Sequence, residues 1–171
     1  AQIETTKSVL DKVKEGRLGK KYKDIVYVGQ SYGSILGHGI AAKYQNVLDA
    51  YILNGWSNKV TNSSVPTLYD LNLLPAKAVK PKQYGQLPAG YLTPSTPMGC
   101  KKLDYYNGGN GKYFDEGMAH RECSTAATAS LGELFTSFLN PLPASGYNGH
   151  VLVITGQYDG FFCARDFLLD H

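Results

Sequence analysis

A serine between two glycines is the clearest chemical feature of this 171-residue sequence, in the segment Gly29-Gln30-Ser31-Tyr32-Gly33. An apolar run at 25–28 precedes it directly, and a helical pattern over about 32–44 follows. This order is typical of a serine nucleophile on a sharp strand-to-helix turn, where flanking glycines avoid collisions with neighbouring backbone. We therefore predict that Ser31 attacks a carbonyl carbon and that the backbone N–H of Tyr32 helps to bind the resulting oxyanion.

Other glycine-rich turns also join a strand to a helix. Gly29, Gly33 and Gly37 do not fit the G-x-G-x-x-G pattern of dinucleotide binding, and no Gly-Lys-Ser/Thr follows to make a phosphate loop. A turn that serves only close packing of helix on strand stays open as the competing interpretation.

A serine nucleophile needs a base, and the base needs an acid that orients it. Asp159 follows the apolar run 151–154 and the pair Thr155-Gly156. Because catalytic groups gather outside the carboxyl ends of parallel strands, we predict that Asp159 is this acid. The alternative is a solvated turn aspartate in Tyr158-Asp159-Gly160.

None of the four histidines fits the role of the base. Two lie in predicted core elements, one lies in the middle segment and one ends the chain: His38, His150, His120 and His171. We expect each of them to be structural or exposed to solvent.

The elements that would position these residues alternate as in an α/β fold with a parallel sheet. The residue pattern predicts an amphipathic helix at 5–15 and a helix with small residues at 32–44. It also predicts a strand at 25–28 that is buried on both faces, as in the centre of a parallel sheet, and further apolar strands at 50–53 and 151–154. The stretch 57–147 holds all eight prolines and long Gly/Tyr-rich runs, with a helical pattern at 131–139. Since structureless loops of this length are uncommon, we predict an inserted lid there, between core segments 1–56 and 148–171.

Three cysteines and one sequon bear on the compartment. Cys100 and Cys123 form a candidate disulfide, although three unpaired thiols are equally compatible with the sequence. No cysteine spacing suits zinc or thiol-redox chemistry, so no metal site is predicted. Asn62 begins a candidate glycosylation site, Asn62-Ser63-Ser64. The candidate disulfide and the sequon slightly favour secretion and otherwise leave the cellular compartment open.

The charge balance argues against nucleic acid as a partner. Seventeen basic and 14 acidic residues give a net charge of +3, with the basic residues mostly in 7–23 and 77–82. Nucleic-acid binding would require a denser basic stripe. No apolar run is long enough to span a membrane, and nothing indicates the oligomeric state.

Three stretches of the sequence resemble the α/β-hydrolase superfamily, and more narrowly fungal α/β-hydrolase-like proteins. The matching residues are 23–34, 50–57 and 149–159 leading into 161–163, which together cover under half of the chain. Gln30 departs from the pattern, because the family more often has His, Glu or Asp at that position.

The resemblance implies an α/β-hydrolase fold, with a mostly parallel sheet, helices on both faces and an inserted lid or cap. The strand before Ser31 would be the fifth of eight. We therefore expect a central fragment, incomplete at both ends, with the catalytic histidine and the second oxyanion donor outside it and little activity of its own.

The implied function is a serine hydrolase that cleaves an ester, or less readily an amide, of a small or lipophilic substrate by a Ser-His-Asp mechanism without a cofactor. The alternative is a catalytically silent relative that serves binding or protein interaction. The same strand-to-helix turn with its serine also supports acyl transfer, lyase and cofactor-free haloperoxidase chemistry in other proteins of this fold.

Overall fold

A computed structural model describes residues 2–57, 72–96, 115–137 and 143–156, together with Asp159 and Phe162. The chain divides into two compact units, the first made of Ala1–Asn58 with Ser137–Thr155 and the second of Lys59–Thr136 with Gly156–His171. Each unit is described by itself.

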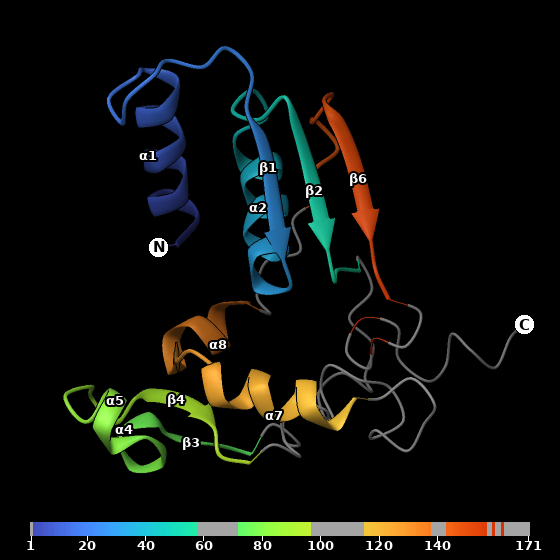
Figure 1. Cartoon of the computed structure of the whole chain (residues 1–171). Coiled ribbons are helices and arrows are strands. Elements are labelled where there is room, and N and C mark those ends of the chain that lie inside the picture. Colours follow the sequence, from blue (N-terminus) through green and yellow to red (C-terminus); the bar gives the residue numbers. More distant parts are fainter. Residues whose placement is uncertain are drawn as a thin grey trace, which may run out of the picture. The chain divides into compact units, whose positions relative to one another are not determined.

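The first unit is a parallel sheet with two helices (Figure 1). Its elements are α1 (Gln2–Lys14), β1 (Val26–Gln30), α2 (Tyr32–Lys43), β2 (Ala50–Asn54) and β6 (His150–Ile154). The strand order is β1-β2-β6, and both pairs are parallel. The predicted α/β class with a parallel sheet is thereby confirmed. The complete hydrolase sheet, its second helical layer and the lid stay predictions.

The core of this unit lies between the sheet and its helices. Helix α2 packs on β1 and β2, and α1 packs on α2. The buried side chains come from α1, α2, β2 and the loops that precede β1 and β2: Leu10, Ile25, Ile40, Ala41, Leu48, Tyr51 and Leu53. Strand β2 is central in the sheet, so its Tyr51 and Leu53 are buried beneath α2.

One sequence prediction about β1 is wrong within the described residues, because this strand is not buried on both faces. It forms one edge of the described sheet, and its Val26 and Val28 are exposed. The register places Val28 in line with Ile52 and Leu152. Side chains in one such row point to the same face, and the helices cover only the opposite one.

Small residues in α2 allow the close approach to the sheet that the sequence predicts. A Cβ atom on Gly37 would overlap the aromatic ring of Tyr27 on β1. Gly39 faces α1 instead, where a Cβ atom would lie 2.6 Å from Cδ1 of Ile3. Glycine therefore stands where the helix touches its neighbours most closely, despite its cost to helix stability.

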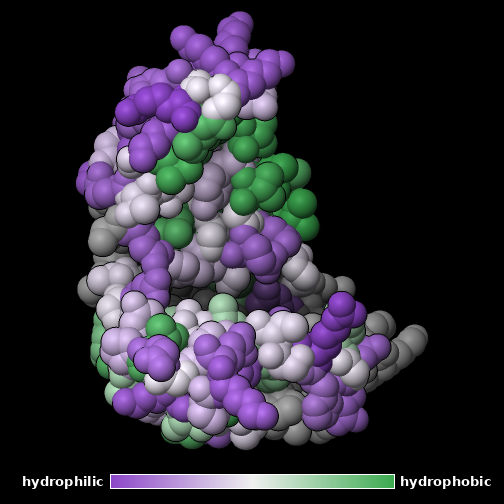
Figure 2. All heavy atoms as spheres, turned by 60° about the vertical axis from the view of Figure 1, so that its left-hand side comes forward, coloured by the Kyte–Doolittle hydropathy of each residue, from purple (hydrophilic) through white to green (hydrophobic). Residues whose placement is uncertain are grey.

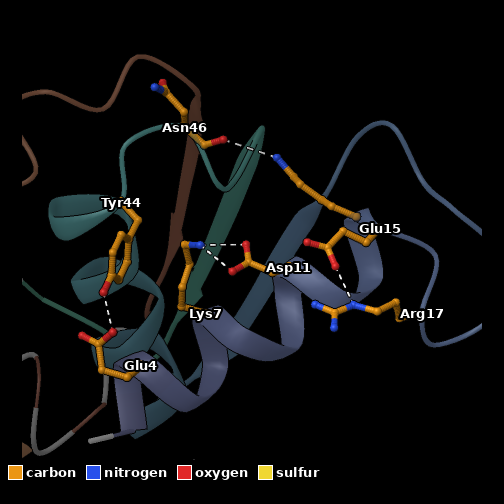
Figure 3. Close-up of polar contacts among 8 residues, drawn as sticks. Glu4, Lys7, Asp11, Glu15, Arg17, Tyr44 and Asn46 are labelled. Carbon is orange, nitrogen blue, oxygen red and sulfur yellow. Dashed lines mark hydrogen bonds and ion pairs between the residues drawn. The ribbon is translucent and has the colours of Figure 1, made fainter.

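Polar contacts join α1 to the elements around it (Figure 3). The Glu4 carboxylate accepts hydrogen bonds from Lys43 Nζ and from the Tyr44 hydroxyl, both at the end of α2. These bonds lower the pKa of Glu4, and the bond to Glu4 raises the pKa of Lys43. Lys7 and Asp11 form an ion pair within α1 at 2.6 Å.

The second unit has an antiparallel sheet and short helices (Figure 1). Its elements are β3 (Leu73–Pro75), α4 (Ala76–Val79), α5 (Pro81–Tyr84), β4 (Tyr91–Pro94), α7 (Glu116–Thr125), β5 (Ala129–Ser130) and α8 (Leu131–Ser137). The strand order is β3-β4-β5. The end of α7 is held by Lys80, whose Nζ donates to the carbonyl oxygens of Cys123, Ser124 and Ala126 at 2.8, 3.1 and 3.3 Å.

Candidate functional site

Ser31 connects β1 to α2 as a single turn residue. Its backbone has φ 50° and ψ −113°, and Asn72 is the only other non-glycine residue with a positive φ in the described part of the chain. This conformation is costly for a residue with a Cβ atom, on the order of 1–3 kcal/mol. A strained turn between a parallel strand and a helix is the geometry that the sequence motif predicts.

Main-chain hydrogen bonds hold Ser31 in this conformation. Its N–H donates to the carbonyl oxygen of Asn54 at 2.9 Å, across the end of the parallel pair β1–β2. Its own carbonyl oxygen accepts the N–H groups of Ser34 and Ile35 at 2.8 and 3.2 Å. The side chain of Ser31 makes no capping bond to α2 and is exposed, so the hydroxyl projects from the turn instead of serving the helix.

Ser34, in the first turn of α2, stabilises the Ser31 turn from its buried side. Its side chain is fully buried, and its Oγ lies 2.8 Å from the carbonyl oxygens of both Gly29 and Asn54. These two oxygens share the single proton of the hydroxyl, and the Asn54 oxygen also accepts the N–H of Ser31. The sequence motif does not include Ser34, and a hydroxyl in the first helical turn after the motif is the signal that could have found it.

The two motif glycines are not equivalent. A Cβ atom on Gly29 would lie 2.5 Å from the carbonyl carbon and oxygen of Gly33 and 2.6 Å from the nitrogen of Ser34. A Cβ atom on Gly33 would meet only the hydroxyl of Tyr27, at 3.9 Å, which is an ordinary contact. The expected steric requirement for glycine therefore holds at Gly29 and is absent at Gly33.

Tyr27 supports the start of α2 from the neighbouring strand. Its hydroxyl donates to the carbonyl oxygen of Gly33 at 2.7 Å, and its ring lies against Gly37. Burial raises the pKa of this phenol, so its proton stays in place as a donor through the neutral range.

The N–H of Tyr32, the predicted oxyanion donor, belongs to the first residue of α2. The helix dipole adds partial positive charge at this end of the helix. An oxygen anion formed beside Ser31 would meet this end of the helix.

Polar groups border the same edge of the sheet. The Asn54 side-chain amide donates to the Gln30 side chain, next to Ser31 in the chain. At the ends of β2 and β6, Thr155 Oγ1 donates to the carbonyl oxygen of Trp56 at 2.7 Å. These contacts fix the carboxyl edge of the sheet, from which Ser31 projects.

Asp159, the predicted acid, belongs to the second unit, whereas Ser31 belongs to the first. Its N–H donates to the carbonyl oxygen of Gly156 at 3.0 Å, and its Oδ1 accepts the N–H of Phe162 at 2.8 Å. The partly buried carboxylate thus shapes its own loop, which is the local behaviour of a turn aspartate. Its catalytic role stays a prediction.

The histidines of the described residues occupy structural or exposed positions. The ring of His38 on α2 lies 5.0 Å from that of Trp56. His150 begins β6, at the end of the sheet opposite Ser31, and His120 is exposed on α7. His171 lies outside the described residues.

Cys123 is buried on α7 and is bonded in a disulfide. Its Sγ lies 3.3 Å from the carbonyl oxygen of Thr96, a close approach without a hydrogen bond, because a disulfide sulfur has no proton to donate. Cys100, its predicted partner, and Asn62, the predicted glycosylation site, both lie outside the described residues.

Within the ranges that the structure describes, no group of histidine, cysteine and carboxylate side chains could hold a metal ion. Among the described helices, none combines the length and apolar character needed to cross a membrane. Comparison with protein-family models and with curated proteins finds no match to this sequence.

Proposed function

We propose that this chain carries the nucleophile of a serine hydrolase with the α/β-hydrolase fold. The reaction is cleavage of an ester, with an amide as the less favoured substrate. The observation that carries the proposal is the backbone of Ser31, at φ 50° and ψ −113° between a parallel strand and a helix. A fold retains such strain where it serves a purpose, and a nucleophile elbow needs it to expose the serine hydroxyl.

In the proposed reaction, the Oγ of Ser31 attacks the ester carbonyl carbon while its proton passes to a histidine base. The oxyanion accepts a hydrogen bond from the N–H of Tyr32. The alcohol then leaves with the proton, and water releases the acid from the acyl-enzyme. Asp159 orients the histidine, which the resemblance places after Asp159 in chain order. The proposal gives this role to none of the histidines within the described residues.

The segment 57–147 is proposed as the lid that contacts the substrate. Its described helices expose large apolar side chains, Met118 on α7 with Leu131 and Phe135 on α8. Apolar groups of this kind line sites for lipophilic ligands. They therefore support a lipophilic acyl or alcohol group, and neither a metal nor an organic cofactor is part of the proposal.

A fluorophosphonate probe tests the assignment, since it phosphonylates only an activated serine. We expect the product of the complete open reading frame to be labelled at Ser31, as mapped by peptide mass spectrometry. Ser31→Ala should abolish labelling, whereas Ser8→Ala, on an exposed position of α1, should leave it unchanged. Labelling that survives in the Ser31→Ala variant, or a folded product that takes up no label, would overturn the proposal.

A further inference from the structure

Positive charge gathers at the end of the first unit where α1 leads into β1. Residues 12–24 contain six basic and two acidic residues, in a chain whose total formal charge is only +3. Hydrophilic side chains cover this upper end of the unit in Figure 2. Because β1 runs from this loop to Ser31, the basic end and the candidate site lie at opposite ends of the strand.

Some of these charges are already engaged. Arg17 Nε pairs with the Glu15 carboxylate at 2.5 Å, and Lys14 Nζ donates to the carbonyl oxygen of Asn46 at 3.3 Å (Figure 3). The lysines that follow, Lys20, Lys21 and Lys23, are exposed, and they take part in none of the ion pairs within the described residues.

Two large apolar side chains are exposed among these lysines. Leu18 is 61% exposed and Tyr22 is 52% exposed. The Nζ of Lys20 lies 5.9 Å from the centre of the Tyr22 ring, so cation and aromatic face share one surface. Gly16 and Gly19, with φ of 75° and 121°, permit the turns on either side of Leu18.

We propose that the loop 17–23 is a docking surface for a lipid surface that carries anionic head groups. The lysines bind the head groups, and Leu18 and Tyr22 enter the boundary between head groups and acyl chains. A nucleic acid would offer the same negative charge but no apolar phase to receive Leu18. Docking here leaves the Ser31 end of the sheet uncovered.

The test compares binding of the chain to vesicles of pure phosphatidylcholine and to vesicles that also contain phosphatidylserine. We expect sedimentation with the anionic vesicles only, and release by added salt. Lys20→Glu/Lys21→Glu should weaken this binding by about tenfold or more, because it replaces two cations that the anionic surface attracts with two anions that it repels. Lys77→Glu/Lys82→Glu changes the total charge equally at exposed positions of the second unit and should bind like the parent chain.

Leu18→Ser separates insertion from charge alone and should weaken vesicle binding while leaving the salt dependence in place. Circular dichroism of each variant verifies that its fold is retained. Equal losses in the two double variants, equal binding to both vesicle types, or an effect of Leu18→Ser no greater than that of Ser8→Ala would each overturn the proposal. Binding of the chain to a DNA duplex without binding to anionic vesicles would also overturn the proposal.

Discussion

The conformation of Ser31 depends on its neighbours and not on its own side chain. The carbonyl oxygen of Asn54 accepts from the N–H of Ser31 and lies within bonding distance of the buried Ser34 hydroxyl. That hydroxyl lies equally close to the carbonyl oxygen of Gly29, at the end of β1. Strand, turn and helix are thus joined at one buried point. A hydrogen bond of this kind contributes about 0.5–1.5 kcal/mol, so Ser34 contributes directly to keeping the strained turn.

The unequal surroundings of the motif glycines give a matched pair of variants. Gly29→Ala would press a Cβ atom into the backbone of Gly33 and Ser34, and we expect it to lower the free energy of unfolding by about 3 kcal/mol. Gly33→Ala has room and replaces a helical glycine, so it should leave stability unchanged or raise it by up to about 1 kcal/mol. Urea denaturation followed by the fluorescence of Trp56, the single tryptophan, measures both.

A comparable loss of stability in Gly33→Ala and Gly29→Ala would contradict the steric difference between the two positions. An additional Gly37→Ala variant should be destabilised as well, because its Cβ atom would meet the Tyr27 ring.

Among the elements, α1 is attached to α2 by the contacts of Glu4 as well as by apolar packing. The pKa of Glu4 is lowered in the folded state by Lys43 and Tyr44, and the pKa of Lys43 is raised by Glu4. A lowered carboxyl pKa stabilises the fold above the ordinary value of 4.5, and this contribution disappears as the pH falls through the folded-state pKa. A raised lysine pKa stabilises the fold below 10.5, and that contribution disappears at higher pH.

Glu4→Gln should therefore lower the free energy of unfolding between pH 4.5 and pH 10.5. It should have no effect at pH values below the folded-state pKa of Glu4. The measurement is the difference in free energy of unfolding between parent and variant across pH, followed by Trp56 fluorescence. Glu116→Gln, in the second unit, should leave the Trp56 transition unchanged. A Glu4→Gln difference that persists unchanged below the folded-state pKa of Glu4 would show that the ion pair is not its source.

The elements of the first unit could be predicted from the sequence because each has a local pattern. The strands predicted at 50–53 and 151–154 are Ala50–Asn54 and His150–Ile154, and the helix predicted at 32–44 is Tyr32–Lys43. The Ser31 turn was equally predictable, since its motif is continuous in the chain.

Contacts between distant residues could not be predicted in the same way. The roles of Ser34 and Asn54 depend on strand register, and the difference between Gly29 and Gly33 depends on which way each Cβ atom would point. The exposure of β1 depends on what covers the second face of the sheet, which no local pattern specifies. The position of Asp159 relative to Ser31 also depends on tertiary structure, so no local pattern specifies it.

At the scale of the whole molecule, the face of the parallel sheet opposite α2 exposes apolar side chains within the described residues of the first unit. Val28 on β1 is 67% exposed, and Leu152 on β6 is 51% exposed, with Ile52 between them in the register. Hydrophobic side chains reach the surface of this unit beside hydrophilic ones in Figure 2. Contiguous apolar surfaces and open strand edges promote association between copies of a chain.

We therefore expect the 171-residue chain to self-associate through this face, with sedimentation coefficients that rise with protein concentration. Val28→Thr/Leu152→Thr places a β-branched residue with high strand propensity at both positions while removing apolar surface. It should shift association to about tenfold higher concentration, because apolar burial contributes roughly 25 cal/mol per Å². Val9→Thr changes an exposed valine on α1, away from the sheet, and should associate like the parent chain. If the parent chain remains monomeric at high concentration, or if Val9→Thr has the same effect as the double variant, the sheet face is not the surface through which copies associate.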